Sequence, residues 1–381
     1  MNKKRILVLT ADAGYGHRSA ASAIEAALGD LYGSHCEVRV ENPIGNEDTP
    51  KFIQQFEESY DDSVTKTPEL YLLSYHALDA PVIAEVAKAV VARLLNGVMY
   101  DLVKTFQPDA IVSTYLFYAR AVSQVTEELE IDCPLAVVIT DLVNVQSLWF
   151  SDMATMHFVP TPAIRQQAYE NNVPATRVRL TGLPVNPEIA RETRSQAELR
   201  REFGWDENLS TCLVVASPRT QKMMEMGQAL DRIPGLQVVV VCGGNSELYD
   251  ELKQAEWEGN VHLYDWVDQM PQMLKASDFI VSKAGGLIVS ESLASGLPMI
   301  IPEALPGQET GNWKYVVENQ AGVWAPTTEE VLQTTTSWLK DGCALLKEVQ
   351  ANARSLGKPE AAYDIARVVW GLAGGDSFTS E

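Results

Sequence analysis

The sequence predicts an α/β protein built from two doubly wound parallel sheets, and two observations carry this prediction. Short apolar runs alternate with longer amphipathic segments along most of the chain, which is typical of βα repeats. The alternation is interrupted at residues 181–187, where two prolines and a glycine stand close together. We therefore expect one domain at 1–185 and another at 186–358. They should face each other across a cleft that receives ligands at the carboxyl ends of the strands.

Strands are expected at seven short apolar runs, with helices at the amphipathic stretches between them. The first three runs belong to the first domain and the last four to the second. A final amphipathic stretch, residues 361–372, is expected to return to the first domain, so that 359–381 forms a C-terminal helical segment. The seven runs are residues 6–10, 110–113, 135–140, 212–216, 238–242, 279–282 and 299–301.

Composition indicates a globular protein and argues against two kinds of partner. The 381 residues are 46% apolar and 21% charged, which is ordinary for a chain with a large buried core. The net charge of −21 disfavours nucleic acid, because no basic stripe is present to meet the phosphates. It also disfavours attraction to anionic lipid by overall charge.

The five cysteines are scattered and include no CxxC pair, which indicates free thiols in a reducing compartment. The apolar run that follows Lys3, Lys4 and Arg5 is too short for a signal peptide, and no apolar run reaches about 18 residues. We therefore expect a cytoplasmic protein. No histidine or cysteine spacing suits zinc, and no Asp-x-Asp occurs, so no metal is expected.

Residues 80–104 are apolar and poorly charged, and they include Val90, Leu94 and Met99. One interpretation is a pair of helices packed in the core. The other is a surface that dips into the interface of a membrane. The sequence leaves both interpretations open.

The most informative segment begins after the apolar run 279–281. Two glycines, Gly285 and Gly286, precede an amphipathic helix, and this order of strand, turn and helix forms a cradle for phosphate. Free backbone N–H groups and the helix dipole point at an anion there. Glu291 lies one or two turns further on, where a carboxylate reaches ribose hydroxyls. The segment therefore predicts a site for a nucleotide that carries an attached group.

The first predicted strand leads into a glycine-containing loop at Gly14 and Gly16, followed by His17. Ser19 stands where the third glycine of a dinucleotide fingerprint would be, so the loop does not indicate a dinucleotide. An imidazole at the mouth of a strand can take a proton from an alcohol near neutral pH. The alternative is a helix cap or a surface contact. We expect His17 to be the base.

Further residues of the second domain are candidates for contacts to the nucleotide and its attached group. Gly243, Gly244 and Asn245 end a predicted strand and open a groove for a flat ligand, and Trp266 and Val267 follow the next strand, beside a base edge. The alternatives are an ordinary turn and an aromatic core residue. The other candidates are Gln308 and Glu309 for sugar hydroxyls, and Lys283 and Arg219 for diphosphate charge.

These residues resemble a known family of enzymes. The chain is similar to monogalactosyldiacylglycerol synthases and processive diacylglycerol glycosyltransferases, which are related to MurG in glycosyltransferase family 28. The resemblance covers nearly the whole chain and implies the GT-B architecture of two Rossmann-like domains. The blocks that carry it are residues 14–21, 140–142 with Trp149, 181–185, 243–245, 283–298 and 306–312.

The resemblance implies an inverting transfer of a hexose from UDP-galactose or UDP-glucose to diacylglycerol or a related lipid. It implies a β-glycolipid product and a peripheral place on the inner face of the cell membrane. It also implies that the UDP-sugar is the donor substrate and that neither a cofactor nor a metal is required. His17 would be the catalytic base, with Asp141 as its partner or an alternative. Gly285 and Gly286 would bind the diphosphate and Glu291 the ribose.

The resemblance also implies which residues would contact the other parts of the donor and the acceptor. Trp266 and Val267 would hold uracil, and Gln308 and Glu309 the hexose. The rest of the expected donor site is Gly16, Arg219, Gly243, Asn245, Met270, Lys283 and Ala284, and the expected acceptor or membrane side is Trp149, Val90, Leu94 and Met99.

Two other functions remain open from the sequence. One is a transferase of the same fold that acts on a polyprenyl-linked or other apolar acceptor. The other is a protein that binds UDP-sugar without turnover. The second is motivated by Ile288, at a position where the family often has threonine, and by residues 217–220, which replace a glycine-rich loop.

Overall fold

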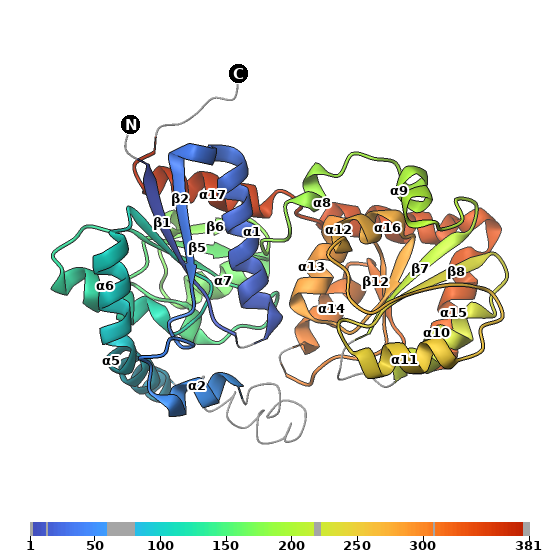
Figure 1. Ribbon diagram of the computed structural model, residues 1–381, viewed down its shortest axis with the longest axis horizontal. Helices are drawn as coiled ribbons and strands as arrows, with labels where there is room; N and C mark the ends of the chain where they lie inside the picture. The colour runs from blue at the N-terminus through green and yellow to red at the C-terminus, as the bar shows by residue number, and fades with distance from the viewer. Residues whose placement is uncertain (1–2, 13, 59–80, 217–221, 308, 376–381) are drawn as a thin grey trace. The chain divides into compact units, whose positions relative to one another are not determined.

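The computed structural model describes residues 3–12, 14–58, 81–216, 222–307 and 309–375, and the chain divides into two compact units (Figure 1). Unit 1 consists of Met1–Pro187 and Glu360–Glu381, and unit 2 consists of Glu188–Pro359. Each unit contains one six-stranded sheet in which all strand pairs are parallel. The expected α/β class with two doubly wound sheets is therefore confirmed.

The sheet of unit 1 has the order β2-β1-β3-β4-β5-β6. The chain passes from β1 to β2 on one side and then crosses to β3 on the other, so the order reverses between β1 and β3. In open parallel sheets such a switch point leaves a crevice at the carboxyl ends of the strands. The strands are β1 (Lys4–Leu9), β2 (Cys36–Glu41), β3 (Ala110–Ser113), β4 (Leu135–Val138), β5 (Met156–Val159) and β6 (Val178–Leu180).

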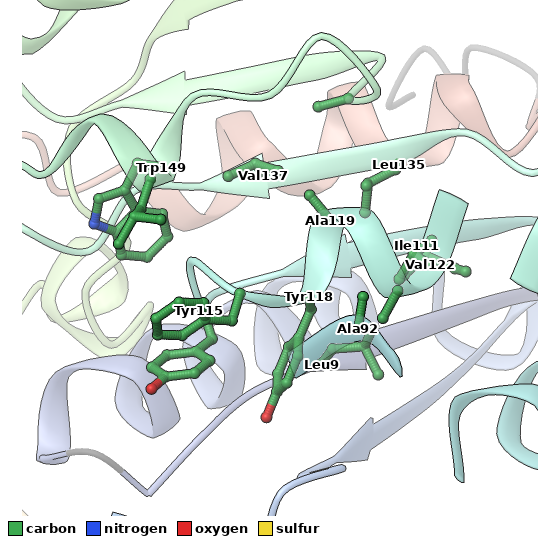
Figure 2. Close-up of a cluster of buried hydrophobic side chains, with 14 of the residues drawn as sticks. Leu9, Ala92, Ile111, Tyr115, Tyr118, Ala119, Val122, Leu135, Val137 and Trp149 are labelled. Carbon is green, nitrogen blue, oxygen red and sulfur yellow. The ribbon is translucent and has the colours of Figure 1, made fainter. Parts of the chain in front are cut away.

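The core of unit 1 lies between this sheet and its helices. Leu9, Ile111 and Val137 of neighbouring strands face Tyr118 and Val122 of helix α6 within one buried cluster (Figure 2). Strands with both faces covered are expected to be almost entirely apolar, and β3 and β4 fit this rule. The helices are α1 (Tyr15–Tyr32), α2 (Lys51–Glu58), α5 (Pro81–Phe106), α6 (Tyr118–Glu128), α7 (Pro162–Glu170) and α17 (Ala361–Leu372).

Helix α17 belongs to unit 1 although it ends the described chain, and it packs against α1 (Figure 1). The rings of Trp370 and Tyr32 stack with centroids 4.0 Å apart. The hydroxyl of Tyr363 donates a hydrogen bond of 2.8 Å to Asp30. The apolar face of α17 would otherwise be exposed, so these contacts explain why the C-terminal helix returns to the N-terminal sheet.

The apolar segment predicted at residues 80–104 is one continuous helix, α5, and not a helix pair. Leu95 and Met99 on its inner face are fully buried in the core of unit 1. Its first half, in contrast, exposes Val82, Val86 and Val90. The core interpretation is thus confirmed for the inner face of a single helix, whereas the membrane interpretation of the exposed face stays a prediction. No helix among the described residues is long and apolar enough to cross a membrane.

The sheet of unit 2 has the order β12-β11-β10-β7-β8-β9. Counted from β7, this is the order 3-2-1-4-5-6 of the doubly wound Rossmann fold, and the switch point lies between β7 and β10. The strands are β7 (Ser210–Val215), β8 (Leu236–Val241), β9 (Asn260–Tyr264), β10 (Phe279–Val281), β11 (Met299–Ile301) and β12 (Gly322–Trp324).

Helices cover both faces of this second sheet, and sequence signals at their ends define several of them. Ser195 with Glu198 and Thr327 with Glu330 form capping boxes, which satisfy the first N–H groups of α9 and α15. The helices are α8 (Glu188–Arg191), α9 (Gln196–Phe203), α10 (Lys222–Asp231), α11 (Ser246–Gln254), α12 (Met270–Ala276), α13 (Gly286–Ala294), α14 (Thr310–Glu318), α15 (Thr328–Leu339) and α16 (Ala344–Leu356).

Candidate functional site

His17 lies in the first turn of α1, directly beyond the carboxyl end of β1 and therefore at the switch point of unit 1. The loops after β3 and β4 meet it there through Thr114 and Thr140. Gly14, the residue before the helix, has φ of 86°, a backbone conformation that favours glycine. A Cβ at Gly16 would meet no atom within 4 Å, so space is open beside the helix start. These features place a half-buried imidazole where a ligand can approach.

The hydrogen bonds of His17 define its tautomer. Nδ1 lies 2.8 Å from the carbonyl oxygen of Thr114 and 2.8 Å from the hydroxyl of Thr140. A carbonyl oxygen only accepts, so Nδ1 carries the proton and donates it. The lone pair is then on Nε2, which makes no hydrogen bond with any residue in the described ranges. This arrangement suits a group that accepts a proton from a substrate hydroxyl.

Burial lowers the pKa of His17 below its ordinary value of 6.5, because an apolar surrounding disfavours the imidazolium. The Asp141 carboxylate and the carbonyl of Thr114 oppose this shift without reversing it. Tyr115 contacts the ring edge-on with centroids 5.1 Å apart and forms part of that apolar surrounding. His17 is therefore neutral, and able to act as a base, at neutral pH.

Asp141 follows β4 and accepts a hydrogen bond of 2.8 Å from Nε1 of Trp149. Trp149 is only 1% exposed and lies in the buried cluster beside Tyr115 (Figure 2). The prediction that Trp149 lies on a membrane-facing surface is therefore wrong, whereas a contact of Trp149 with the acceptor stays a prediction. Its indole N–H instead orients Asp141, whose charge stabilises the protonated form of His17.

Two residues of the expected membrane surface on α5 also need correction. Met99 is fully buried, and Leu94 is half-buried, because both turn toward the core side of the helix. Val90 is 50% exposed, as expected. These residues were predicted to share one surface because the helix is apolar on all sides. Hydrophobic periodicity alone therefore did not show which of its faces packs on the sheet.

In unit 2 the predicted phosphate turn lies at the switch point, after β10. Gly285 is the residue before α13, and no side chain caps the first N–H groups of that helix. Free N–H groups at a helix start bind anions, and the helix dipole adds to the attraction. The methyl carbon Cγ2 of Ile288 lies 3.6 Å from the position of a Cβ at Gly285, so an apolar side chain borders this turn. The turn offers backbone donors to a diphosphate.

Glu291, on the same helix, is half-buried and makes no hydrogen bond or ion pair with a described residue. Burial without a partner raises its pKa from 4.5 to about 7. A partly buried carboxylate without partners is costly to ionise. A ligand that donates hydrogen bonds to it therefore stabilises the ionised form. Ribose hydroxyls are such donors.

Glu309 has other partners than the expected hexose. Its Oε1 lies 2.7 Å from Nζ of Lys283, and its Oε2 accepts a hydrogen bond of 2.8 Å from the backbone N–H of Leu305. The side chain of Glu309 is only 7% exposed, whereas that of Lys283 is 22% exposed. Both carboxylate oxygens are thus occupied within unit 2.

The loops after β8 and β9 carry the other expected donor contacts. Trp266 is 60% exposed, and its ring carbon lies 3.5 Å from the position of a Cβ at Gly244. Gly243 has φ of 64°, and the N–H of Gly244 bonds the carbonyl of Asp265 at 3.0 Å, so the two loops are joined. The flat face of an exposed indole beside glycine backbone suits a planar base.

The structure describes some of the remaining residues that were expected to bind the donor, and others lie outside the described ranges. Asn245 caps α11 by accepting a hydrogen bond of 3.1 Å from the N–H of Leu248, so its side-chain oxygen already has a structural role. Met270 begins α12 and Val267 precedes it, both half-buried. Arg219 and Gln308 lie outside the described residues. Among the residues that the structure does describe, no group of three His, Cys, Asp or Glu side chains is arranged to hold a metal ion.

Sequence reasoning missed the residues that orient the predicted ones. Thr114 and Thr140 hold the imidazole of His17, and Asn312 donates a hydrogen bond of 2.9 Å to the carbonyl of Ala284 in the phosphate turn. The two threonines were detectable in principle, because each stands at the carboxyl end of a predicted strand. Asn312 ends the block 306–312 that carries the family resemblance, but the sequence assigned it no role.

Comparisons with known proteins identify two related families. A family model described as monogalactosyldiacylglycerol (MGDG) synthase matches residues 17–185, and one described as UDP-N-acetylglucosamine 2-epimerase matches residues 148–370. Monogalactosyldiacylglycerol synthase 2, chloroplastic, from Arabidopsis thaliana is 30% identical over 375 residues, which cover 96% of this chain and 80% of the relative.

Solved structures share the fold at lower identity. MurG of Acinetobacter baumannii has a TM-score of 0.60 at 17% identity and covers 97% of this chain and 99% of its own. The UDP-GlcNAc 2-epimerase from Neisseria meningitidis, bound to UDP-GlcNAc, has a TM-score of 0.60 at 15% identity, with 96% and 100% coverage. Because the relative that is 30% identical spans almost the whole chain, the protein belongs to the monogalactosyldiacylglycerol synthase family, and over residues 148–370 it also belongs with the UDP-N-acetylglucosamine 2-epimerase family.

Proposed function

We propose that the protein transfers a hexose from UDP-galactose or UDP-glucose to the free hydroxyl of diacylglycerol or a related lipid. The observation that carries the proposal is the neutral, oriented imidazole of His17, with Nε2 free to accept a proton. The names of the relatives in the family support the lipid acceptor.

The proposed reaction is a single displacement with inversion. The acceptor oxygen forms a bond to C1 of the hexose while its proton moves to Nε2 of His17. The bond between C1 and the phosphate oxygen breaks, and UDP leaves with the electron pair. Asp141 stabilises the imidazolium that forms on His17. The product is a β-glycolipid.

On the donor side, we assign the diphosphate to the uncapped start of α13 and to Lys283, and the ribose to Glu291. Trp266 and Val267 would contact uracil. The ammonium and the helix dipole would meet the negative charge of the leaving UDP, so the residues present supply charge stabilisation without a metal. Activity is then expected to persist in the presence of a chelator.

The test is an assay of purified protein with radiolabelled UDP-galactose or UDP-glucose and diacylglycerol in mixed micelles. A labelled glycolipid, formed together with UDP, supports the proposal. A product formed with a polyprenyl phosphate but not with diacylglycerol would show that the acceptor is a different lipid. Binding of UDP without any product would indicate a binding protein. The match over residues 148–370 favours a second candidate, epimerisation at C2 of UDP-N-acetylglucosamine. Incubation of the purified protein with UDP-N-acetylglucosamine and no acceptor would then form a new UDP-sugar.

We further propose that the exposed half of α5 docks on the cytoplasmic face of a membrane, where the acceptor lipid resides. Val82, Ile83, Val86 and Val90 are 77%, 47%, 59% and 50% exposed and follow one another at helical spacing. Contiguous exposed apolar side chains are uncommon on soluble surfaces and suit insertion among lipid head groups. The five free cysteines fit a reducing compartment.

A triple variant, V82S/V86S/V90S, is expected to lose flotation with liposomes, because it removes apolar area from the docking face. Turnover of a short-chain, water-soluble diacylglycerol should stay within about twofold of wild type. The control is L345S, which changes another exposed apolar residue in unit 2 and should leave flotation unchanged. Unaltered flotation of the triple variant would reject α5 as the docking surface.

A further inference from the structure

The first turn of α14 holds the phosphate turn by two side chains. Glu309 bonds the ammonium of Lys283 at 2.7 Å, and Asn312 donates to the carbonyl of Ala284 at 2.9 Å. The N–H of Ala284 is held in turn by the carbonyl of Glu303 at 3.0 Å. The backbone between β10 and α13 is therefore fixed from α14 and from the loop after β11.

Both carboxylate oxygens of Glu309 already have partners within unit 2. Oε1 faces Lys283, Oε2 accepts from the N–H of Leu305, and the side chain is 7% exposed. A hexose contact would have to break a short, largely buried ion pair, and removing one partner of such a pair is costly. The geometry argues against a direct role in binding the hexose.

The position of the ion pair connects it to the diphosphate. Oε1 of Glu309 lies 3.6 Å, and Cε of Lys283 lies 3.8 Å, from the position of a Cβ at Gly285, the residue before α13. An unpaired carboxylate there would repel a diphosphate at the helix start. Paired with Lys283, its charge is balanced, and the ammonium is held close to the free N–H groups.

We propose that Glu309 is a positioning residue, which acts through Lys283 on the diphosphate of the donor and does not contact the hexose. The inference rests on the proposed function, because it presumes that the start of α13 binds UDP. It assigns hexose recognition to residues other than Glu309. It also means that the two positions should behave as one unit in binding experiments.

The experiment is a double-mutant cycle with E309Q, K283M and the double variant, in which calorimetry measures the affinity for UDP and for UDP-galactose. E309Q is expected to lower the affinity for both ligands by the same factor, about threefold, because the ammonium of Lys283 loses the carboxylate that holds it in place. K283M is expected to lower the affinity for both ligands by about thirtyfold, since it removes a cation and leaves the carboxylate of Glu309 facing the diphosphate. Adding E309Q to K283M should restore part of the loss, because it removes that carboxylate.

An E309Q variant that binds UDP normally but loses affinity for UDP-galactose would overturn the inference, since this pattern marks a direct hexose contact. Additive losses in the double variant would also overturn it. If K283M does not fold, the comparison of the two ligands in E309Q decides alone. Wild-type protein that binds neither ligand would contradict the proposed function itself and the inference with it, whereas an unequal effect of E309Q would contradict the inference only.

Discussion

Replacing His17 with alanine is expected to lower kcat by about 10²–10⁴-fold and to leave the affinity for UDP-galactose unchanged. The physical reason is that the imidazole is the only group we assign to accept the proton of the lipid hydroxyl. Donor contacts are assigned to unit 2, so binding of the nucleotide does not require the ring. Initial rates with diacylglycerol micelles measure the first effect, and calorimetry with UDP-galactose measures the second.

The control is His35→Ala, because His35 is an exposed histidine in the short turn after α1 and no catalytic role is assigned to it. Its rate should match that of wild type. The pH profile adds an independent readout: since burial lowers the pKa of His17, the acid limb of kcat/KM should lie below pH 6.5. A His17→Ala enzyme within a few-fold of wild type, or with an unchanged acid limb, would show that another group is the base.

Replacing Glu291 with glutamine is expected to weaken UDP-galactose binding by about tenfold to a hundredfold, because hydrogen bonds from hydroxyls to a carboxylate are stronger than those to an amide. The same change should stabilise the protein. Burial raises the pKa of Glu291 from 4.5 to about 7, so the folded state holds this proton more tightly than the unfolded state. The folded state therefore loses stability as pH rises from 4.5 to 7, and at pH 8 the neutral amide should add roughly 1–3 kcal/mol to the free energy of unfolding.

The pKa of Glu291 also predicts a pH dependence of donor binding. Ribose hydroxyls donate to the ionised carboxylate, so the affinity for UDP-galactose should rise as the pH increases through about 7 and level off about one pH unit higher. UDP-galactose is the right probe, because the terminal phosphate of free UDP titrates in the same range, at about 6. Calorimetry of wild type and Glu291→Gln across this range is the measurement. A pH dependence that persists in the variant, or equal affinities of the two proteins, would remove Glu291 from the ribose site.

Strands that are buried on both faces were predictable from the sequence. The runs 110–113 and 299–301 coincide with β3 and β11, because a central parallel strand is apolar throughout. The edge strands β2 and β12 were missed. β2 alternates charged and apolar residues and is half-buried, and β12 begins with a glycine, so neither produces an apolar run. β5 contains His157 and β6 contains Arg179, which interrupt their patterns in the same way.

Candidate site residues were readable in the sequence where a glycine-containing turn follows a predicted strand. Glycines before α1 and α13 marked both switch points, and a histidine or a carboxylate close behind them suggested a base and a ribose contact. The sequence did not predict the interactions of side chains whose partners lie far away in the chain. Glu309 was interpreted as a sugar ligand because its partner, Lys283, is 26 residues away in the chain. Trp149 was interpreted as a surface residue because the sequence does not show that its indole is buried against Asp141.

The sequence by itself determined two parallel βα sheets, the position of the phosphate turn and the identity of the base candidate, because hydrophobic periodicity and glycine positions are local properties of the chain. Only the tertiary structure decided which nitrogen of His17 is free, which face of α5 is exposed and which carboxylates are unpaired. Each of these depends on contacts between segments far apart in the sequence, such as the bond between His17 and Thr114. Burial and pairing set the charge state of a side chain, and both arise only when the chain has folded.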